Sequence, residues 1–372
     1  MAIKYLAGER LIGTAAERAA LSGSNLTAVP QTSWKELGRY TLTGEADTIN
    51  VGSGTQSGTD GLGTGTFAAK DNLMILCYIL GTGTIHPSLR FNGDTGNNYA
   101  SRVSTNGATD WTNNTQSSMR YGAGTSTTDQ FIVTTIRNNA VNEKFAITHM
   151  AYDQSDTLYR EETTAKWANT SNQITSIQVP NGQSGGFLTG SEVVVLGCDD
   201  DEADSGTNFW QELGSDTLTS QGDVLTTGTI TAKKYLMVNT HHLGDITSGT
   251  SANSDYNMTL NDSTSGYAVR HSQNGGGETT ATSAAFINGW LGYQDRFVNA
   301  FGINVASKRK WMIGEDCGGI TNYGAGSAPN REEWVGEWNN TSDSITKVTV
   351  TNSSARSGAY GVGSNLKVWG SN

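Results

Sequence analysis

The residues best suited to bind a ligand lie in a loop of small polar residues, Asn92-Gly93-Asp94-Thr95-Gly96-Asn97-Asn98. Asn92, Asp94 and Asn97 offer the carboxylate and amide oxygens that Ca²⁺ takes in acidic loops. The twelfth position of this loop is Val103, however, where an EF-hand supplies a bidentate glutamate. We therefore expect a tight turn held by side-chain to backbone hydrogen bonds, with ligand contact through its amides as the alternative.

Two tryptophans, Trp167 and Trp338, are the second candidate for binding chemistry. Each precedes an Asn-Thr-Ser or Asn-Asn-Thr-Ser turn and then a predicted strand. An exposed indole at a strand entry could stack on a sugar ring, whereas a buried one closes the end of a β-sandwich. We expect core packing for both and keep sugar binding as the alternative.

Metal and catalytic chemistry have weaker candidates. His241, His242 and His271 name no third converging ligand, so we expect surface or loop histidines. The three cysteines form no CxxC pair. The sequence therefore predicts no metal, no cofactor and no disulfide framework.

An acid and a base, Glu36 and Arg102, recur as Glu212 and Arg270. We interpret them as an ion pair that ties the first strand of each copy to the fourth. Catalysis needs a second group within hydrogen-bond reach, and we find no further carboxylate, histidine or cysteine that recurs. No GxSxG or phosphate-loop motif is present either, so we predict no enzyme and no catalytic residue.

The elements that position these residues come in two copies. Trp34-Lys35-Glu36-Leu37-Gly38 returns as Trp210-Gln211-Glu212-Leu213-Gly214, and Tyr99-Ala100-Ser101-Arg102 returns as Tyr267-Ala268-Val269-Arg270. The matches keep their order, which indicates a tandem duplication of a complete domain. We predict an N-terminal arm (1–33), a first sandwich (34–199), an acidic linker (200–209) and a second sandwich (210–372).

The composition favours an all-β fold. Glycine occurs 46 times, proline 4 times, and only 16% of residues are charged, which suits strands separated by tight turns. Apolar alternation predicts eight short strands in each copy, hence two antiparallel sandwiches of jelly-roll type. The unbroken apolar run at residues 73–80 predicts a central strand with one face under a loop or a neighbouring subunit.

Charge and hydropathy exclude some partners. A net charge of −11 repels nucleic acid, and no apolar run reaches the length of a membrane span or signal peptide. Five acids within residues 199–204 predict a solvated linker that lets the sandwiches string out. In the arm, Thr14-Ala15-Ala16-Glu17 fits a capping box that opens a short helix. We expect the arm to dock in an assembly, with Tyr5, Leu6, Leu11 and Ile12 as contacts.

Three segments resemble structural proteins of marine tailed viruses. The arm sequence from Lys4 to Arg18 is similar to their leaders, the segment from Leu89 to Ala100 resembles a part of their β-sandwich modules, and the ending from Tyr360 to Gly370 is similar to the closing strand. The second copy departs from this pattern in the segment from Leu260 to Tyr267.

The resemblance implies a non-enzymatic virion protein, either a capsid decoration or a short fibre docked by its arm. It would be assembled in the host cytoplasm, lie on the outer surface of the virion, contact other virion proteins and form a homo-oligomer. One alternative is a receptor- or glycan-binding tail or fibre protein that recognises host-surface glycan. Another is a double jelly-roll major capsid protein.

Overall fold

The computed structural model describes residues 34–52, 65–121, 129–138, 140–154, 157–199, 208–243, 255–274, 276–288, 295–319, 330–352 and 360–372. Within these ranges it contains strands and turns and no α-helix, which confirms the all-β prediction. None of these residues belongs to a helix long and apolar enough to cross a membrane. The arm with Tyr5, Leu6, Leu11 and Ile12, and residues 200–207 of the linker, lie outside the described residues.

The first sandwich pairs an eight-stranded antiparallel sheet with a four-stranded one. The large sheet has the order β1 (Lys35–Thr41), β14 (Glu192–Cys198), β3 (Asn72–Ile79), β9 (Gln130–Arg137), β10 (Lys144–Gln154), β11 (Thr157–Trp167), β6 (Tyr99–Thr105) and β7 (Trp111–Gln116). The small sheet has the order β2 (Thr48–Val51), β12 (Ile177–Pro180), β5 (Ser88–Phe91) and β8 (Met119–Arg120). A short pair, β4 (Gly81–Thr82) and β13 (Gly186–Phe187), lies beside them.

The second sandwich repeats the strand order of the large and the small sheet. Its large sheet has the order β15 (Gln211–Thr217), β26 (Asn365–Ser371), β17 (Tyr235–His242), β22 (Asp295–Ile303), β23 (Lys310–Gly319), β24 (Asn330–Trp338), β19 (Tyr267–Gln273) and β20 (Thr279–Ala284). The small sheet has the order β16 (Val224–Thr226), β25 (Val348–Thr351), β18 (Asn257–Leu260) and β21 (Ile287–Asn288). The prediction of two tandem antiparallel sandwiches from a duplication is confirmed.

The prediction of eight strands in each copy is wrong, because the described residues of each copy form a large and a small sheet with twelve strands between them. The missed strands are short, polar at the sheet edge, or charged. Edge strand β20 has the sequence TTATSA and is mostly exposed. Strand β11 contains Arg160, Glu161 and Glu162, and these charges concealed its strand character because their partners lie elsewhere in the chain.

Each sandwich buries its own apolar core between its two sheets. Alternate residues of β3, Leu73, Ile75, Cys77 and Ile79, point into the first core. Leu236 and Val238 of the equivalent strand β17 point into the second core. This inward alternation is the pattern of a strand with one face on a core.

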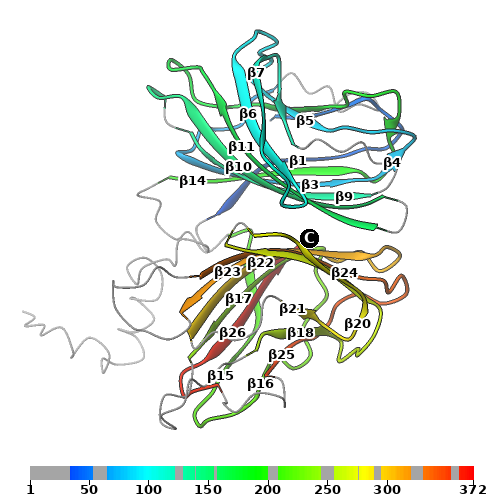
Figure 1. Ribbon diagram of the computed structural model, residues 1–372. Coiled ribbons are helices and arrows are strands. Elements are labelled where there is room, and N and C mark those ends of the chain that lie inside the picture. The colour runs from blue at the N-terminus through cyan, green and yellow to red at the C-terminus, as the bar shows by residue number, and fades with distance from the viewer. Residues whose placement is uncertain are drawn as a thin grey trace, which may run out of the picture.

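The opposite faces of the two large sheets pack against each other, so that the molecule has four β layers (Figure 1). Met74, Leu76 and Tyr78 of β3 belong to a third apolar cluster that also contains Trp311 and Ile313 of β23. Burial on both faces explains the unbroken apolar run. The second sandwich covers this face, not a loop or a neighbouring subunit. The expectation that the sandwiches string out along the linker is therefore wrong.

Candidate functional site

The loop at residues 92–98 is a turn tied to its surroundings by its own side chains. Asn92 and Gly93 have positive φ angles of 50° and 68°. The Asn92 side-chain oxygen accepts hydrogen bonds from the backbone amides of Thr175 and Ser176. Asp94 accepts from the Gly96 amide at 2.8 Å. Asn97 is exposed.

Asp94 links this turn to Trp167, whose indole N–H donates to the Asp94 carboxylate at 2.7 Å. Burial opposes ionisation of Asp94, but the hydrogen bonds from Trp167, Asn98 and Gly96 outweigh it and lower the pKa of Asp94. The carboxylate that the sequence suggested for calcium is thus occupied within the fold.

Both tryptophans lie in the cores of their sandwiches. Trp167 is 1% exposed and Trp338 is 3% exposed. Trp167 stacks on Tyr99, and Trp338 stacks on the equivalent Tyr267, with ring centroids 6.3 and 6.1 Å apart. The ammonium groups of Lys144 and Lys310 lie over the two indoles. Neither indole presents a face on which a sugar could stack.

The expected ion pair between the first and fourth strands does not form. In the large sheet β1 and β6 are separated by five strands, β14, β3, β9, β10 and β11. Glu36 pairs instead with Arg39 on its own strand. Arg102 pairs with Asp110, and Arg270 pairs with Glu278, which occupies the equivalent position at the β19 and β20 hairpin.

The expectation of surface histidines is wrong for two of the three. His242 is fully buried and His271 is 8% exposed, while His241 is exposed. His271 lies 2.6 Å from Glu332, measured from Nδ1 to Oε1. The described residues place no three His, Cys, Asp or Glu side chains in an arrangement that could hold a metal ion.

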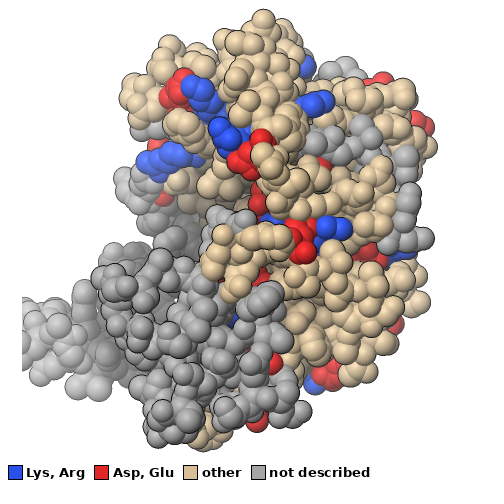
Figure 2. Space-filling model, viewed as in Figure 1, with Lys and Arg blue, Asp and Glu red and all other residues tan. Residues whose placement is uncertain are grey.

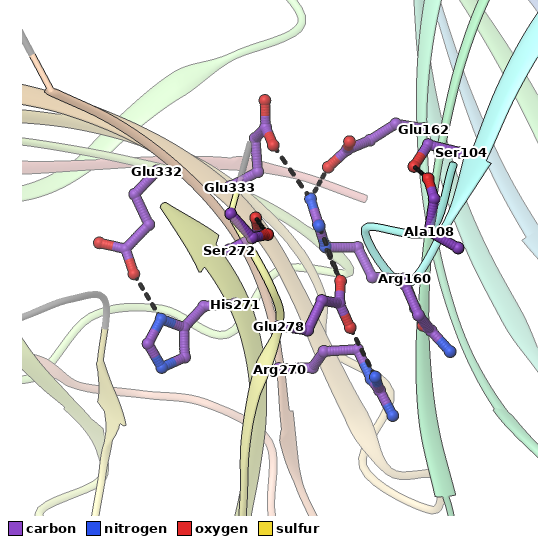
Figure 3. Close-up of polar contacts among 12 residues, drawn as sticks. Ser104, Ala108, Arg160, Glu162, Arg270, His271, Ser272, Glu278, Glu332 and Glu333 are labelled. Carbon is purple, nitrogen blue, oxygen red and sulfur yellow. Dashed lines mark hydrogen bonds and ion pairs between the residues drawn. The ribbon is translucent and has the colours of Figure 1, made fainter. Parts of the chain in front are cut away.

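A charged junction joins the two sandwiches at Arg160 of β11 (Figure 3). The guanidinium of Arg160 donates to Glu278 at 2.7 and 2.9 Å and to Glu333 at 3.2 Å, both in the second sandwich. It also pairs with Glu162 of its own strand. Glu278 in turn accepts from Arg270. The Arg160 and Glu278 side chains are 4% and 6% exposed, so these charges are held away from bulk water.

The strand that carries Arg160 contains a motif that recurs in the second copy. The comparison of the two copies in the sequence analysis overlooked it. Arg160-Glu161-Glu162 matches Arg331-Glu332-Glu333 at an offset of 171, the same offset that relates Trp167 to Trp338. The statement that no further carboxylate recurs is therefore wrong. Aligning the segments directly before the two tryptophans would have found the motif.

Further polar contacts cross between the two sandwiches. Glu192 of β14 accepts from Lys234 at 2.8 Å and from the Tyr235 hydroxyl at 2.7 Å. Arg309 of the second sandwich pairs with Asp153 of the first. These contacts join the two large sheets in addition to the apolar cluster.

The sheets are not in contact everywhere, and a cleft of about 680 Å³ remains between them. Its walls are mainly apolar and come from both sandwiches, including Trp34, Met74, Phe145, Ile147, Phe301 and Ile313. A second, polar hollow shares Ile147, His149 and Glu315 with it and reaches Arg160. Openings between domains are where proteins most often bind ligands or partners.

Two apolar side chains on the cleft wall are unusually exposed. Phe145 and Ile147 are neighbours on one face of β10 and are 58% and 52% exposed. Strand register makes Trp311 and Ile313 their equivalents in the second copy, and these are 1% and 4% exposed beneath the first sandwich. The same position is thus a buried protein contact in one copy and an open apolar surface in the other.

Charge is sparse and mixed on the face of the molecule drawn in Figure 2. In Figure 2 most of the described surface carries no charge, and basic and acidic side chains lie next to one another. No extended basic patch is visible on this face.

The comparisons with known proteins add little to this geometry. No protein-family model matches the sequence, and no curated protein matches it. Among solved structures, human GIVD cytosolic phospholipase A2 aligns with 72% of this chain at 7% identity. The TM-score is 0.12 and the alignment covers 30% of that protein, so the likeness carries no argument.

Proposed function

We propose that this chain is a non-enzymatic structural protein of a virus particle, a capsid decoration or short fibre docked by its N-terminal arm. The resemblance of the arm and sandwich segments to tailed-virus proteins motivates the proposal. The apolar packing of the two sandwiches against each other supports it, since such proteins act through subunit contacts rather than through catalytic groups. Its partners would be other virion proteins and further copies of itself.

The observation that carries an assembly role is the open apolar surface at Phe145 and Ile147. Soluble proteins rarely leave neighbouring large apolar side chains exposed unless a partner covers them. The equivalent residues, Trp311 and Ile313, are covered by a β-sheet in the same molecule. A surface of this kind suits a protein contact better than a small polar ligand.

The two alternatives stand differently against the geometry. A glycan-binding role loses the two indoles as stacking platforms because both are buried. A double jelly-roll capsid protein needs its two rolls held in contact, and the packing of the two large sheets supports this alternative more than a pair of separated sandwiches would. Copy number distinguishes the remaining readings.

The test is quantitative mass spectrometry of purified particles from the source culture. A decoration protein is expected in many copies per particle, in addition to a separate and abundant shell protein. A few copies per particle would favour a tail or fibre tip, and finding this chain as the main shell protein itself, with no other abundant shell protein, would favour the capsid role. Absence from washed particles would refute a virion role altogether.

A second test addresses the assembly surface in the full chain. Phe145→Glu should shift the protein toward monomer in light scattering coupled to gel filtration. Val224→Glu is the matched control, because Val224 is 47% exposed and lies on the small sheet of the second sandwich. Equal effects of both substitutions, or none from Phe145→Glu, would contradict the role of this surface.

A further inference from the structure

A row of titratable and charged side chains crosses the interior of the second sandwich. Strand register places His242 of β17 opposite Arg296 of β22, and Asp316 of β23 opposite Glu332 of β24. His271 of β19 completes the row through its contact with Glu332. All five side chains are at least nine-tenths buried. The row therefore lies on the inner face of the large sheet, beside the apolar core.

The first sandwich has no such row. The positions equivalent to His242, Arg296, Asp316 and His271 hold Ile79, Gln130, Met150 and Val103. Of the five positions only Glu161, the equivalent of Glu332, is ionisable in the first copy. Two copies with the same strand order thus differ here by four substitutions that all introduce a titratable or charged group.

The groups in this row contact one another directly. Nε of Arg296 lies 3.8 Å from Oδ1 of Asp316. Strand register sets Asp316 directly opposite Glu332, so two buried carboxyls face each other, and the repulsion between like charges this close favours a proton on one of them. The His242 ring stacks on Tyr360 with centroids 4.5 Å apart, and neither ring nitrogen has a hydrogen-bond partner among the described residues.

The surroundings set the protonation of both ends of the row. Burial, followed by the neighbouring charges of Arg296 and His241, holds the pKa of His242 well below its usual value. Burial raises the pKa of Asp316 to about 7, with Glu332 adding to the rise and Arg296 opposing it. The titratable groups that face the row from the other elements are Tyr256 and Tyr360, and Asp223 and Asp255 lie near Tyr360.

We propose that the row is an internal proton-exchange site that keeps the stability of the second sandwich constant through mildly acidic pH. In the unfolded chain at pH 5, His242 carries a proton and Asp316 does not. In the folded chain the imidazole is neutral and the pair of carboxyls holds one proton. Folding therefore moves one proton from an imidazole nitrogen to a carboxyl oxygen, and the number of bound protons does not change.

The consequence follows from linkage, because stability depends on pH only where folded and unfolded states bind different numbers of protons. Between about pH 4 and 6.5, His242 and Asp316 contribute to the pH dependence of the unfolding free energy with opposite signs, and the two contributions cancel. Either residue alone would make the second sandwich sensitive to pH. This proposal does not depend on the proposed function.

The experiment compares the full chain with Asp316→Asn, His242→Ile and the double variant. Hydrogen exchange of peptides from β17 and β22 to β24 reports the opening constant between pH 4.5 and 6.5. Relative to wild type, the opening constant of the Asp316→Asn variant should increase about tenfold for each pH unit by which the pH falls. The opening constant of the His242→Ile variant should decrease about tenfold for each pH unit by which the pH falls. The double variant should show the same pH dependence as wild type.

Met150→Leu, at the first-copy position equivalent to Asp316, is the control and should leave the profile unchanged. A single variant whose profile parallels wild type would overturn the proposal. If a variant fails to fold, an NMR titration of the wild-type His242 ring decides the matter. A neutral ring down to pH 5 supports the exchange site, and protonation near pH 6 contradicts it.

Discussion

Truncating the two core tryptophans tests whether they are packing residues. We expect Trp167→Ala and Trp338→Ala each to destabilise its sandwich by roughly 3–5 kcal/mol, the usual cost of removing a buried Trp or Phe. The structure supports this size because both indoles are nearly fully buried and stack on a tyrosine. Trp167→Ala also removes the hydrogen bond from the Trp167 indole to Asp94. No equivalent bond is made by the Trp338 indole within the described residues.

Trp167→Ala should therefore cost more than Trp338→Ala, by about 1 kcal/mol for the lost hydrogen bond. Trp167→Phe separates the two contributions, since it keeps a ring in the core and removes only the donor. For domains of this size, about 2–4 °C of melting temperature corresponds to each kcal/mol, which predicts drops of roughly 6–20 °C for the alanine variants.

Differential scanning calorimetry measures the drop, and hydrogen exchange locates it. Trp167→Ala should increase exchange in β6, β10 and β11, and Trp338→Ala should do so in β19, β23 and β24, because these strands surround each indole. A melting temperature within 2 °C of wild type, combined with lost binding to host glycans, would refute the packing role and favour receptor recognition.

Three further predictions concern the polar contacts. Glu278→Ala should weaken the junction between the sandwiches. The loss should be less than the roughly 3–5 kcal/mol typical of a broken buried pair, because Arg160 keeps its ion pairs with Glu162 and Glu333. A larger radius of gyration in small-angle scattering would show that the two sandwiches have separated. Burial opposes ionisation of Glu192, but hydrogen bonds from Lys234, Thr41 and Tyr235 lower its pKa, so its stabilisation is present above pH 4.5 and is lost as pH falls. Glu192→Gln should therefore show a shallower acid loss of stability than wild type in denaturant titrations, and identical slopes would contradict this. Lys144→Met should destabilise the first sandwich by roughly 1–3 kcal/mol in all, since the ammonium binds the carbonyls of Ala140, Asn142 and Asn169, which water can partly replace; an unchanged unfolding midpoint would exclude that role.

Part of this fold is predictable from local pattern. The duplication, the all-β class and the central position of β3 follow from matched segments and from apolar periodicity. Strands such as β11 and β24 escape such analysis, because their charges at Arg160 and Glu332 find partners only after the strands pair. Strand β7, with the sequence WTNNTQ, is polar because it lies at a sheet edge.

The candidate site was less predictable, since its parts are distant in sequence. The loop at residues 92–98 is local, and its Asx turn was expected from its residues. Arg160 and Glu278 are 118 residues apart and meet only because the large sheets face each other. The acidic linker suggested separation, but apolar side chains such as Tyr78 and Trp311 decided the packing. His242 was expected at the surface because a strand sequence alone does not identify the residue across the sheet.

The face-to-face packing also has a consequence for how such a pair of domains holds together. A covalent connection of a few residues keeps two binding surfaces at an effective concentration in the millimolar range. An interface between tethered copies can therefore stay closed although separate molecules with the same surfaces would dissociate. The two surfaces of such an interface also need not consist of the same residues, as they must in a symmetric dimer of identical chains. The exchange of Phe145 for Trp311 and of Asn72 for Tyr235 at equivalent positions illustrates this freedom. In this protein, the duplication allows the Trp311 surface of the second sandwich to adapt to the first sandwich. The equivalent Phe145 surface of the first sandwich can then adapt to a different partner.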